Sequence, residues 1–513
     1  MPCTRRRFLD LAAKGTAAAL LGGPLGDQLR AAAPERRNVL FIAVDDLRPQ
    51  LGCYGHKRIL SPHIDRLASR GLLFQRAYCQ QAVCGATRAS LLSGLRPDSS
   101  KVHGNSTPLA TVHTDLLTLP KHFRRNGYET VSLSKIYHHR GRDDPGGWSR
   151  PEWSPKGNWV GRGYLSEKGK AVCRQEAERI GKLRDRALQK AKDRKDAARI
   201  RQRFRTGLGP PIDCADVPDN AYPDGVTADR AVEELRRLKD QPFFLAVGFV
   251  KPHLPFNAPK KYWDLYRRSE IKLADNPFAP KGAPKLALTN WGELRNYVGV
   301  PKSGPVGDDQ ARELIHGYHA CVSYTDALVG RVIDELDRLG LRQRTVIILW
   351  GDHGWKLGEH AMWCKHTNFE LDTRVPMILS APGQKSAGRR TDALVEFVDI
   401  YPTLCELCGL EMPKHCEGTS MVPLLGDPAR KWKSAAFSQY PRGRIMGYSM
   451  RTGRWRYTEW VERKTGKAVA RELYDHKNDP AENVNVAARA ENAETLKELS
   501  AMLSKGWRAA RPG

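Results

Sequence analysis

Cys84 and Arg88 are the first residues whose types and spacing could take part in chemistry. They lie four residues apart at a predicted junction between a loop and a helix, with Ala89 to Leu92 in the first turns of that helix. Gly94 marks either an irregularity in the helix or its end. Alone, a cysteine and an arginine at this spacing are common and favour a buried structural cysteine. A chemical role for the pair therefore depends on partners elsewhere in the chain.

Two polar pairs follow apolar runs that have the pattern of buried strands. Asp45 and Asp46 end one run, and Asp352 and His353 come just after another. Carboxylate oxygens are hard ligands that suit Ca²⁺ or Mg²⁺. The first pair alone could equally cap a helix or carry surface charge. Both pairs together with the cysteine motif predict a metal site.

Four further ionisable side chains lie on loops that follow predicted strands, namely Lys135, His138, His253 and Lys365. Singly, each is typical of an exposed lysine or a structural histidine. Beside a pair of carboxylates, they match what the hydrolysis of an anionic ester needs. That reaction uses fixed positive charge on the non-bridging oxygens and a proton donor for the leaving alcohol.

Alternating strands and helices are expected to position these side chains. The strands are predicted at 38–44, 130–133, 243–250, 345–350 and 376–380, and the helices at 62–70, 119–126, 228–238 and 311–339. This alternation predicts an α/β fold with a doubly wound, mostly parallel central sheet flanked by helices. The polar residues gather at the carboxyl ends of the strands, where such sheets bind ligands.

Two regions depart from this alternation. Residues 168–205 are dense in lysine and arginine, lack a wide apolar stripe and predict a solvent-exposed, partly helical insertion without a catalytic role. Beyond residue 428, short aromatic strands and an amphipathic helix predict a smaller C-terminal antiparallel sheet with a helix. The predicted organisation is therefore an α/β domain over 34–428, which contains the insertion, and a C-terminal subdomain over 429–513.

The run from Cys84 to Gly94 resembles the sulfatase signature C-x-P-x-R-x-x-x-x-T-G, with Ala86 in place of Pro and Ser93 in place of Thr. The run 351–360 and two short patterns near the C-terminus are also similar to this family. The resemblance covers nearly all of the predicted mature chain. It indicates formylglycine-dependent sulfatases of the alkaline phosphatase superfamily, and within them the iduronate-2-sulfatase-like branch.

The resemblance implies a role for each candidate residue. Cys84 would be oxidised to formylglycine, whose hydrated aldehyde is the nucleophile, by a formylglycine-generating enzyme or a radical sulfatase-maturating enzyme. The implied ligands of one Ca²⁺ are Asp45, Asp46, Asp352, His353 and the formylglycine at Cys84. The other implied roles belong to Arg88 and Lys135, which hold the formylglycine, His138, which orients or deprotonates one of its hydroxyls, and His253 and Lys365, which contact the sulfate and help the alcohol leave. The implied substrate is a sulfated sugar or polysaccharide.

Two departures from the family pattern affect these expectations. Ala86 bears on which maturation enzyme acts, and the resemblance suggests that the radical type tolerates alanine better. The insertion at 168–205 is not part of the pattern and could reshape substrate access. Two rival functions stay open, namely a phosphonate or phosphodiester hydrolase of the same superfamily, and a non-catalytic polyanion-binding protein in which Cys84 remains a thiol.

The 513-residue chain is strongly basic, with a net charge of +27 at pH 7. Such a field favours polyanionic partners. No nucleic-acid-binding module stands out, so a sulfated or phosphorylated substrate is favoured over nucleic acid. The alternative is that the lysines and arginines form only a solvated surface.

The first 33 residues have the order of an export signal. Twin arginines in the run 4–9 precede a weakly apolar stretch over 11–25 and a small-residue cleavage site at 31–33. This resembles a twin-arginine signal and predicts an exported protein, periplasmic or secreted. A mitochondrial presequence or a disordered basic tail are the alternatives. Elsewhere no stretch approaches about 18 uninterrupted apolar residues, so no membrane span is predicted.

The chain has eleven cysteines, an odd number. In an exported protein, a disulfide could form within the group Cys405, Cys408 and Cys416. The favoured interpretation for most of the cysteines is that they are small buried hydrophobic residues.

Overall fold

The computed structural model describes residues 36–156, 163–204 and 209–512, and residues 36–513 form one compact unit. The predicted export signal lies outside the described residues, as does Arg205 at the end of the basic insertion. Within the described ranges, no helix combines the length and the apolar character needed to cross a membrane.

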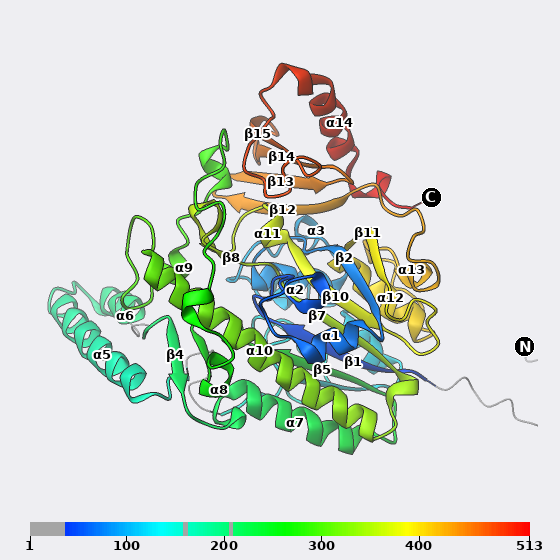
Figure 1. The fold of residues 1–513 in the computed structure, drawn as a ribbon, viewed down its shortest axis with the longest axis horizontal. Helices are drawn as coiled ribbons and strands as arrows, with labels where there is room; N and C mark the ends of the chain where they lie inside the picture. Colours follow the sequence, from blue (N-terminus) through cyan, green and yellow to red (C-terminus); the bar gives the residue numbers. More distant parts are fainter. Residues whose placement is uncertain (1–35, 157–162, 205–208, 513) are drawn as a thin grey trace, which may run out of the picture. The chain divides into compact units, whose positions relative to one another are not determined.

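A seven-stranded sheet in the order β11-β2-β10-β7-β1-β5-β3 forms the centre of this unit (Figure 1). Its strands are β1 (Asn38–Val44), β2 (Leu72–Tyr78), β3 (Glu129–Ser134), β5 (Phe243–Phe249), β7 (Thr345–Gly351), β10 (Arg374–Ser380) and β11 (Arg390–Glu396). β10 is antiparallel to both of its neighbours, and the other pairings are parallel. The predicted mostly parallel α/β sheet is confirmed, with one reversed strand.

The reversal of β10 follows from the segment between it and β7. A parallel return would need a crossover that carries the chain back to the other edge of the sheet. Residues 352–373 form no such crossover. They stay at the carboxyl edge of β7, where they carry Asp352, His353 and Lys365. The chain therefore re-enters the sheet from that edge and runs back.

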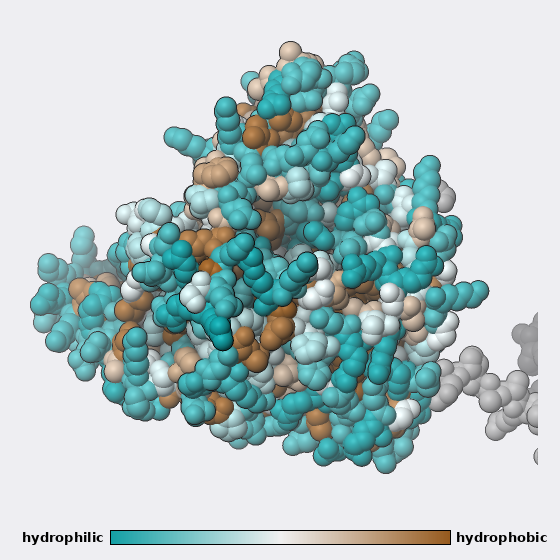
Figure 2. All heavy atoms as spheres, in the orientation of Figure 1, coloured by the Kyte–Doolittle hydropathy of each residue, from teal (hydrophilic) through white to brown (hydrophobic). Residues whose placement is uncertain are grey.

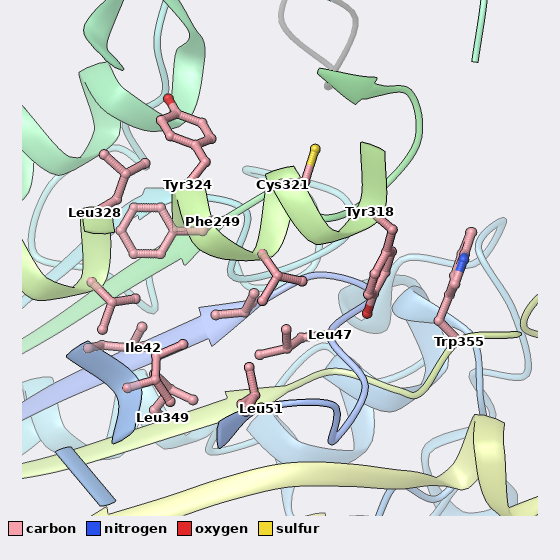
Figure 3. Packing of buried hydrophobic residues seen from close by; sticks show 14 of the residues in the cluster. Ile42, Leu47, Leu51, Phe249, Tyr318, Cys321, Tyr324, Leu328, Leu349 and Trp355 are labelled. Atoms are coloured by element: carbon pink, nitrogen blue, oxygen red, sulfur yellow. The ribbon is translucent and has the colours of Figure 1, made fainter. Parts of the chain in front are cut away.

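Side chains alternate along β1 between two hydrophobic cores, one on each face of the sheet. Ile42 belongs to the core covered by α1 (Pro62–Ala68), α7 (Pro223–Leu238) and α10 (Asp308–Arg338). Phe41 belongs to the core covered by α2 (Cys84–Ser93), α4 (Leu119–Arg125) and α12 (Ile400–Leu407). Figure 3 shows the first core, where Tyr318 and Leu328 of α10 lie over β1 and β7. Helices on both faces make the sheet doubly wound, as predicted.

The C-terminal region forms a separate antiparallel sheet in the order β12-β13-β14-β15. Its strands are β12 (Ala436–Arg442), β13 (Ile445–Arg451), β14 (Trp455–Glu462) and β15 (Ala468–Asp475). The helix α14 (Ala493–Ala509) packs on this sheet through a small core that includes Leu499 and Tyr457. This sheet and helix confirm the prediction, whereas the domain boundary at 428 stays a prediction.

The basic insertion consists mainly of two exposed helices, α5 (Glu167–Leu188) and α6 (Arg194–Arg203). Only Gly169 is buried among the residues of both helices, so the predicted exposed and helical character is confirmed. The strand β4 (Ile212–Ala215) follows the insertion and pairs with β6 (Phe256–Pro259). The remaining short elements are α3 (Pro97–Ser100), α8 (Lys260–Trp263), α9 (Gly292–Arg295), α11 (Glu370–Thr373), α13 (Val422–Gly426), β8 (Lys356–Leu357) and β9 (Trp363–Cys364).

The cysteines of the described ranges are all free thiols. Cys405 and Cys416 are buried in the core beneath α12, and Cys408 packs at its margin. No disulfide forms among these three, and the interpretation of Cys405 and Cys416 as buried hydrophobic residues is confirmed.

Candidate active site

Two adjacent strands bring the predicted polar pairs together. β1 and β7 are parallel neighbours, and their register places Val44 opposite Gly351. The residues that follow these positions must therefore meet at the carboxyl edge of the sheet. The backbone N–H of Asp46 donates to Asp352 Oδ1 at 3.0 Å. Asp45, Asp46, Asp352 and His353 are all fully buried.

Cys84 is the first residue of α2, which begins earlier than the sequence predicted. Gly94 adopts φ = 72° and ends the helix, as one of the two sequence interpretations expected. The Cys84 Sγ atom lies 3.4 Å from Asp45 Oδ1 and 3.3 Å from His353 Nε2. The thiol thus points into the carboxylate cluster from the positive end of the helix.

Arg88 lies one turn further along α2 and is completely buried. Its Nε donates to Asp352 Oδ2 at 3.0 Å, and its terminal nitrogen lies 3.3 Å from Asp45 Oδ1. It also donates to the carbonyl oxygen of Ile136 at 3.0 Å. Arg88 therefore ties β1, β7 and the loop after β3 together, and it offsets the charge of two carboxylates.

Lys135 and His138 follow β3, as predicted, but they differ in their relation to Cys84. Lys135 Nζ forms an ion pair with Asp45 and lies 4.0 Å from Cys84 Sγ. His138 makes no hydrogen bond with Cys84 in the described part of the chain, and its Nδ1 is buried without a partner there. Burial and the neighbouring Lys135 lower the pKa of His138 to about 3, so this imidazole is neutral.

His253 and Lys365 both lie close to Asp46, and both contact Glu293. Lys365 Nζ lies 2.9 Å from Asp46 Oδ1 and 3.0 Å from Glu293. His253 Nε2 lies 3.2 Å from the same Glu293 and 3.9 Å from Asp46 Oδ2. Its Nδ1 is 2.6 Å from the carbonyl oxygen of Leu254. Lys365 is almost fully buried, whereas His253 and Glu293 are each about one-fifth exposed, so this side of the cluster is open to solvent.

Charge and burial oppose one another at the carboxylates. Burial raises the pKa of Asp45, but Lys135 and Arg88 outweigh it and hold that pKa well below its usual range. Burial raises the pKa of Asp46, and Lys365 offsets only part of the effect. Burial and then Asp45 raise the pKa of the Cys84 thiol well above its usual value. Cys84 is therefore protonated here and lacks the thiolate character of a reactive cysteine.

The donor set fits one hard cation. Single ligating atoms of Asp45, Asp46, Cys84 and His353 all lie within 4.8 Å of one another. Asp352 adds a carboxylate whose Oδ1 is 3.6 Å from His353 Nε2. Carboxylate oxygens dominate this set, which suits Ca²⁺ better than a softer metal.

Two residues of the site were absent from the sequence prediction. Glu293 lies in α9, outside every strand and helix that the sequence predicted, and only the fold brings it to Lys365. Tyr318 lies inside α10, donates to the carbonyl oxygen of Asp46 at 2.9 Å and accepts from the N–H of Arg48 at 3.1 Å. A tyrosine on an apolar helix face resembles any other core residue, so the sequence around Tyr318 gives no indication of this role.

The comparisons with known proteins agree with this geometry. A family model described as Sulfatase matches residues 37–410, and a model described as N-sulphoglucosamine sulphohydrolase, C-terminal, matches residues 358–508. Iduronate 2-sulfatase of Mus musculus is 34% identical over an alignment that covers 91% of this chain and 94% of that protein. Iduronate 2-sulfatase of Homo sapiens is 33% identical over an alignment that covers 90% of this chain and 93% of that protein.

Solved structures share the fold. Phosphonate monoester hydrolase of Agrobacterium radiobacter superposes with a TM-score of 0.71 and 25% identity, over 92% of this chain and 95% of that one. The family model spans most of the chain, and the iduronate 2-sulfatases match nearly all of it. The chain belongs to the sulfatase family.

Proposed function

We propose that this protein hydrolyses sulfate esters of a sulfated sugar or polysaccharide. The observation that carries the proposal is the position of Cys84, whose Sγ lies against Asp45 and His353 at the start of α2. Lys135 Nζ lies 4.0 Å from this thiol, and Lys365 forms an ion pair with Asp46 of the same cluster. A nucleophile at Cys84 would thus be surrounded by fixed positive charge, which an anionic sulfate requires.

The proposal includes one Ca²⁺ and a formylglycine at Cys84. Asp45, Asp46, Asp352 and His353 would hold the ion, and a formylglycine there would supply a further oxygen ligand and the nucleophilic hydroxyl. The bound ion would offset negative charge at the site. Arg88 keeps Asp45 and Asp352 in place. Lys135, Lys365 and His253 would contact the sulfate, and His253 would protonate the leaving alcohol.

The relatives suggest the first substrates to try. The iduronate 2-sulfatases at 33–34% identity make a 2-sulfated iduronate the first candidate. A bacterial-type export signal makes other sulfated polysaccharides equally suitable for testing. Comparing release rates from a panel of sulfated disaccharides would identify the sugar and its ring position.

The rival function within the superfamily is phosphonate or phosphodiester hydrolysis. Phosphonate monoester hydrolase has a similar fold, so this rival function needs a direct test. An aryl sulfate and an aryl phosphodiester with the same leaving group would separate the two. We expect the sulfate to be the faster substrate by at least about tenfold. A faster phosphodiester would replace the proposal with its rival.

The state of Cys84 decides between an enzyme and a non-catalytic polyanion-binding protein. The protein should be produced together with a formylglycine-generating enzyme or, in a parallel culture, a radical sulfatase-maturating enzyme. Mass spectrometry of the Cys84 peptide should then show an aldehyde in place of the thiol. Sulfate release should vanish in Cys84→Ala while the melting temperature stays close to that of the wild type. Turnover by Cys84→Ala above background would refute this mechanism.

Export is a separate part of the proposal and rests on Arg5 and Arg6 with the apolar stretch that follows. The twin-arginine route would deliver a folded, already modified enzyme to the periplasm or the medium. Replacing both arginines by lysine should leave the protein in the cytoplasmic fraction. Equal export of the two forms would contradict this route.

A further inference from the structure

The insertion that carries α5 and α6 concentrates positive charge on two exposed helices. Residues 167–204 contain fourteen lysines and arginines against six acidic residues, a net charge of +8. Apart from Gly169 at the first turn of α5, none of the residues in either helix is buried. Figure 2 shows this region, at the left of the view, covered mainly by hydrophilic side chains. We call residues 167–204 the basic arm.

The acidic residues of the basic arm do not neutralise it. Four ion pairs join near neighbours within one helix, namely Lys170–Glu167, Arg179–Glu176, Arg184–Asp185 and Arg199–Asp196. Ten exposed basic side chains of the arm form no ion pair in the described part of the chain, among them Arg174, Lys182, Arg186, Lys190, Lys195 and Arg201. A surface of this kind is an uncompensated positive field rather than a network of salt bridges.

The base of the basic arm is attached to the segment that carries His253. Asp213 of β4 accepts from the backbone N–H groups of Leu165 and Ser166 at 2.8 and 3.2 Å. β4 pairs with β6, and β6 begins three residues after His253. The side chain of Asn257 in β6 donates to the carbonyl oxygen of Gly163 at 2.8 Å. The base of the arm is therefore anchored, through β4 and β6, to the chain that directly follows His253.

The same base also contacts the chain just after α9, the short helix that carries Glu293. The backbone N–H of Val298 donates to the carbonyl oxygen of Gly209, the first described residue after the arm, at 3.0 Å. Gly169 lies so close to Asp213 that an added Cβ would be 2.3 Å from its Oδ1. These contacts fix where α5 begins. With 22 residues, α5 extends about 33 Å from this base.

We propose that the basic arm binds the sulfated polysaccharide chain whose ester the active site cleaves, so that the substrate is a polymer rather than a free monosaccharide. This inference rests on the proposed function. Charge complementarity carries it, because a sulfated polymer presents repeated anions along its length and the arm presents repeated unpaired cations. Such an arm raises the local concentration of polymer near the candidate active site without contacting the reacting ester.

The test compares two variants that lose the same charge. In the arm variant, Arg174, Lys182, Arg186, Lys190, Lys195 and Arg201 are changed to Gln. In the control variant, six exposed lysines outside the arm are changed to Gln, namely Lys385, Lys414, Lys464, Lys467, Lys477 and Lys505. Both variants have the same net charge, so a difference between them reports the location of the charge.

For a sulfated polysaccharide, the arm variant should lose about tenfold in kcat/KM, mainly through KM, and its rate should depend less on salt. For an aryl sulfate it should stay within about twofold of the wild type, and the control variant should lose far less on the polymer. Equal losses in the two variants, or an equal loss on the small and the polymeric substrate, would overturn the proposal.

A binding measurement separates this inference from the proposed function. On a column of immobilised dextran sulfate, the wild type should elute at higher salt than the arm variant, whether or not it releases sulfate. Absence of turnover with arm-dependent binding would contradict the proposed function alone. Arm-dependent retention that is stronger on DNA or on anionic lipid vesicles than on dextran sulfate would contradict a sulfated polysaccharide as the partner.

Discussion

At the scale of single residues, the site is a buried group of carboxylates, each of which contacts at least one basic side chain. Asp45 contacts Lys135, Arg88 and Cys84, and Asp46 contacts Lys365. A substitution at Asp45 or Asp352 would also remove one of the two carboxylates that pair with the buried Arg88. Such a loss costs several kcal/mol in folding. Among the residues that the structure describes, Arg88 forms no ion pair with Asp46, so Asp46 is the better position for testing metal binding without unfolding the protein.

We expect Asp46→Asn to lose most of its bound calcium and most of its activity, because a neutral amide is a weaker ligand than a carboxylate. Elemental analysis of the purified protein should find about one calcium per chain in the wild type and far less in the variant. Asp334→Asn, a change in a surface ion pair with Arg66, serves as the control and should retain the ion. Active wild-type enzyme without a divalent ion, or with stoichiometric zinc, would contradict the calcium site.

Glu293 is expected to act as a positioning residue, since it contacts both Lys365 and His253. Glu293→Ala should lower kcat between about 10- and 100-fold, because a small displacement of the Lys365 and His253 side chains misplaces the sulfate. Glu293→Gln keeps a hydrogen-bonding group and should fall between this variant and the wild type. Steady-state kinetics with an aryl sulfate measure the effect. A kcat unchanged in Glu293→Ala would show that Lys365 and His253 hold their places without it.

At the scale of elements, the position of Cys84 depends on how closely α2 approaches the chain after α3. A Cβ added to Gly85 would lie 2.4 Å from the carbonyl oxygen of Gly104 and 2.9 Å from Asn105 Oδ1. Backbone atoms cannot swing aside as a flexible side chain can. Position 85 therefore requires glycine, because α2 lies so close to Gly104 and Asn105 that a side chain does not fit. The N–H of Gly85 also donates to Asn105 Oδ1 at 2.7 Å.

Gly85→Ala should shift the start of α2 and lower activity while costing about 1–3 kcal/mol in stability, the usual range for overpacking. Gly104→Ala is the matched control, because a Cβ there meets nothing within 4 Å. Sulfate release and urea denaturation should be measured for both. If Gly104→Ala were as damaging as Gly85→Ala, the close approach would not be the cause.

The elements also show what the sequence could and could not predict. β1, β5 and β7 were predicted because continuous apolar runs end in polar residues, and this same pattern placed Asp45 and Asp352 at one edge. β2 was missed, because Gln75 and Arg76 interrupt its apolar run, and both are only half-buried. The direction of β10 was not predictable, because local sequence does not record from which edge a strand enters. Glu293 and Tyr318 reach the site only through the packing of distant segments.

At the scale of the whole described unit, the C-terminal sheet is joined to the active-site segment by buried charge. Arg456 of β14 donates to Glu482 at 2.7 Å and pairs with Glu370 of α11, which follows the loop that carries Lys365. Glu482 also accepts from the backbone N–H of Glu370 at 2.8 Å. All three side chains are buried or nearly so. The small sheet therefore supports the segment between β7 and β10 rather than standing apart from it.

Arg456→Ala should destabilise the protein by about 3–5 kcal/mol, because Glu370 and Glu482 would lose the buried arginine that they share. Urea denaturation at neutral pH measures this, and activity should decline over the same urea range because the pair supports the active-site segment. Arg454→Ala is the control, since Arg454 is about half exposed where it pairs with Asp475, and its loss should change stability far less. If the small sheet unfolded at a lower urea concentration than the one at which activity is lost, this coupling would be contradicted.

The pH dependence of the same variant tests whether charge is the cause. Burial raises the pKa of Glu370 and Glu482, but Arg456, with smaller contributions from Arg451 at Glu370 and from His476 at both, outweighs burial and holds both pKa values below the usual range. A carboxyl with a depressed pKa stabilises the fold above its unfolded pKa, about 4.3 for Glu, and loses that contribution as the pH falls through its lower folded value. The gap in unfolding free energy between wild type and Arg456→Ala should therefore be fully present at pH 7 and narrow below about pH 4. A gap that stays constant down to acidic pH would instead indicate lost packing of the arginine stem.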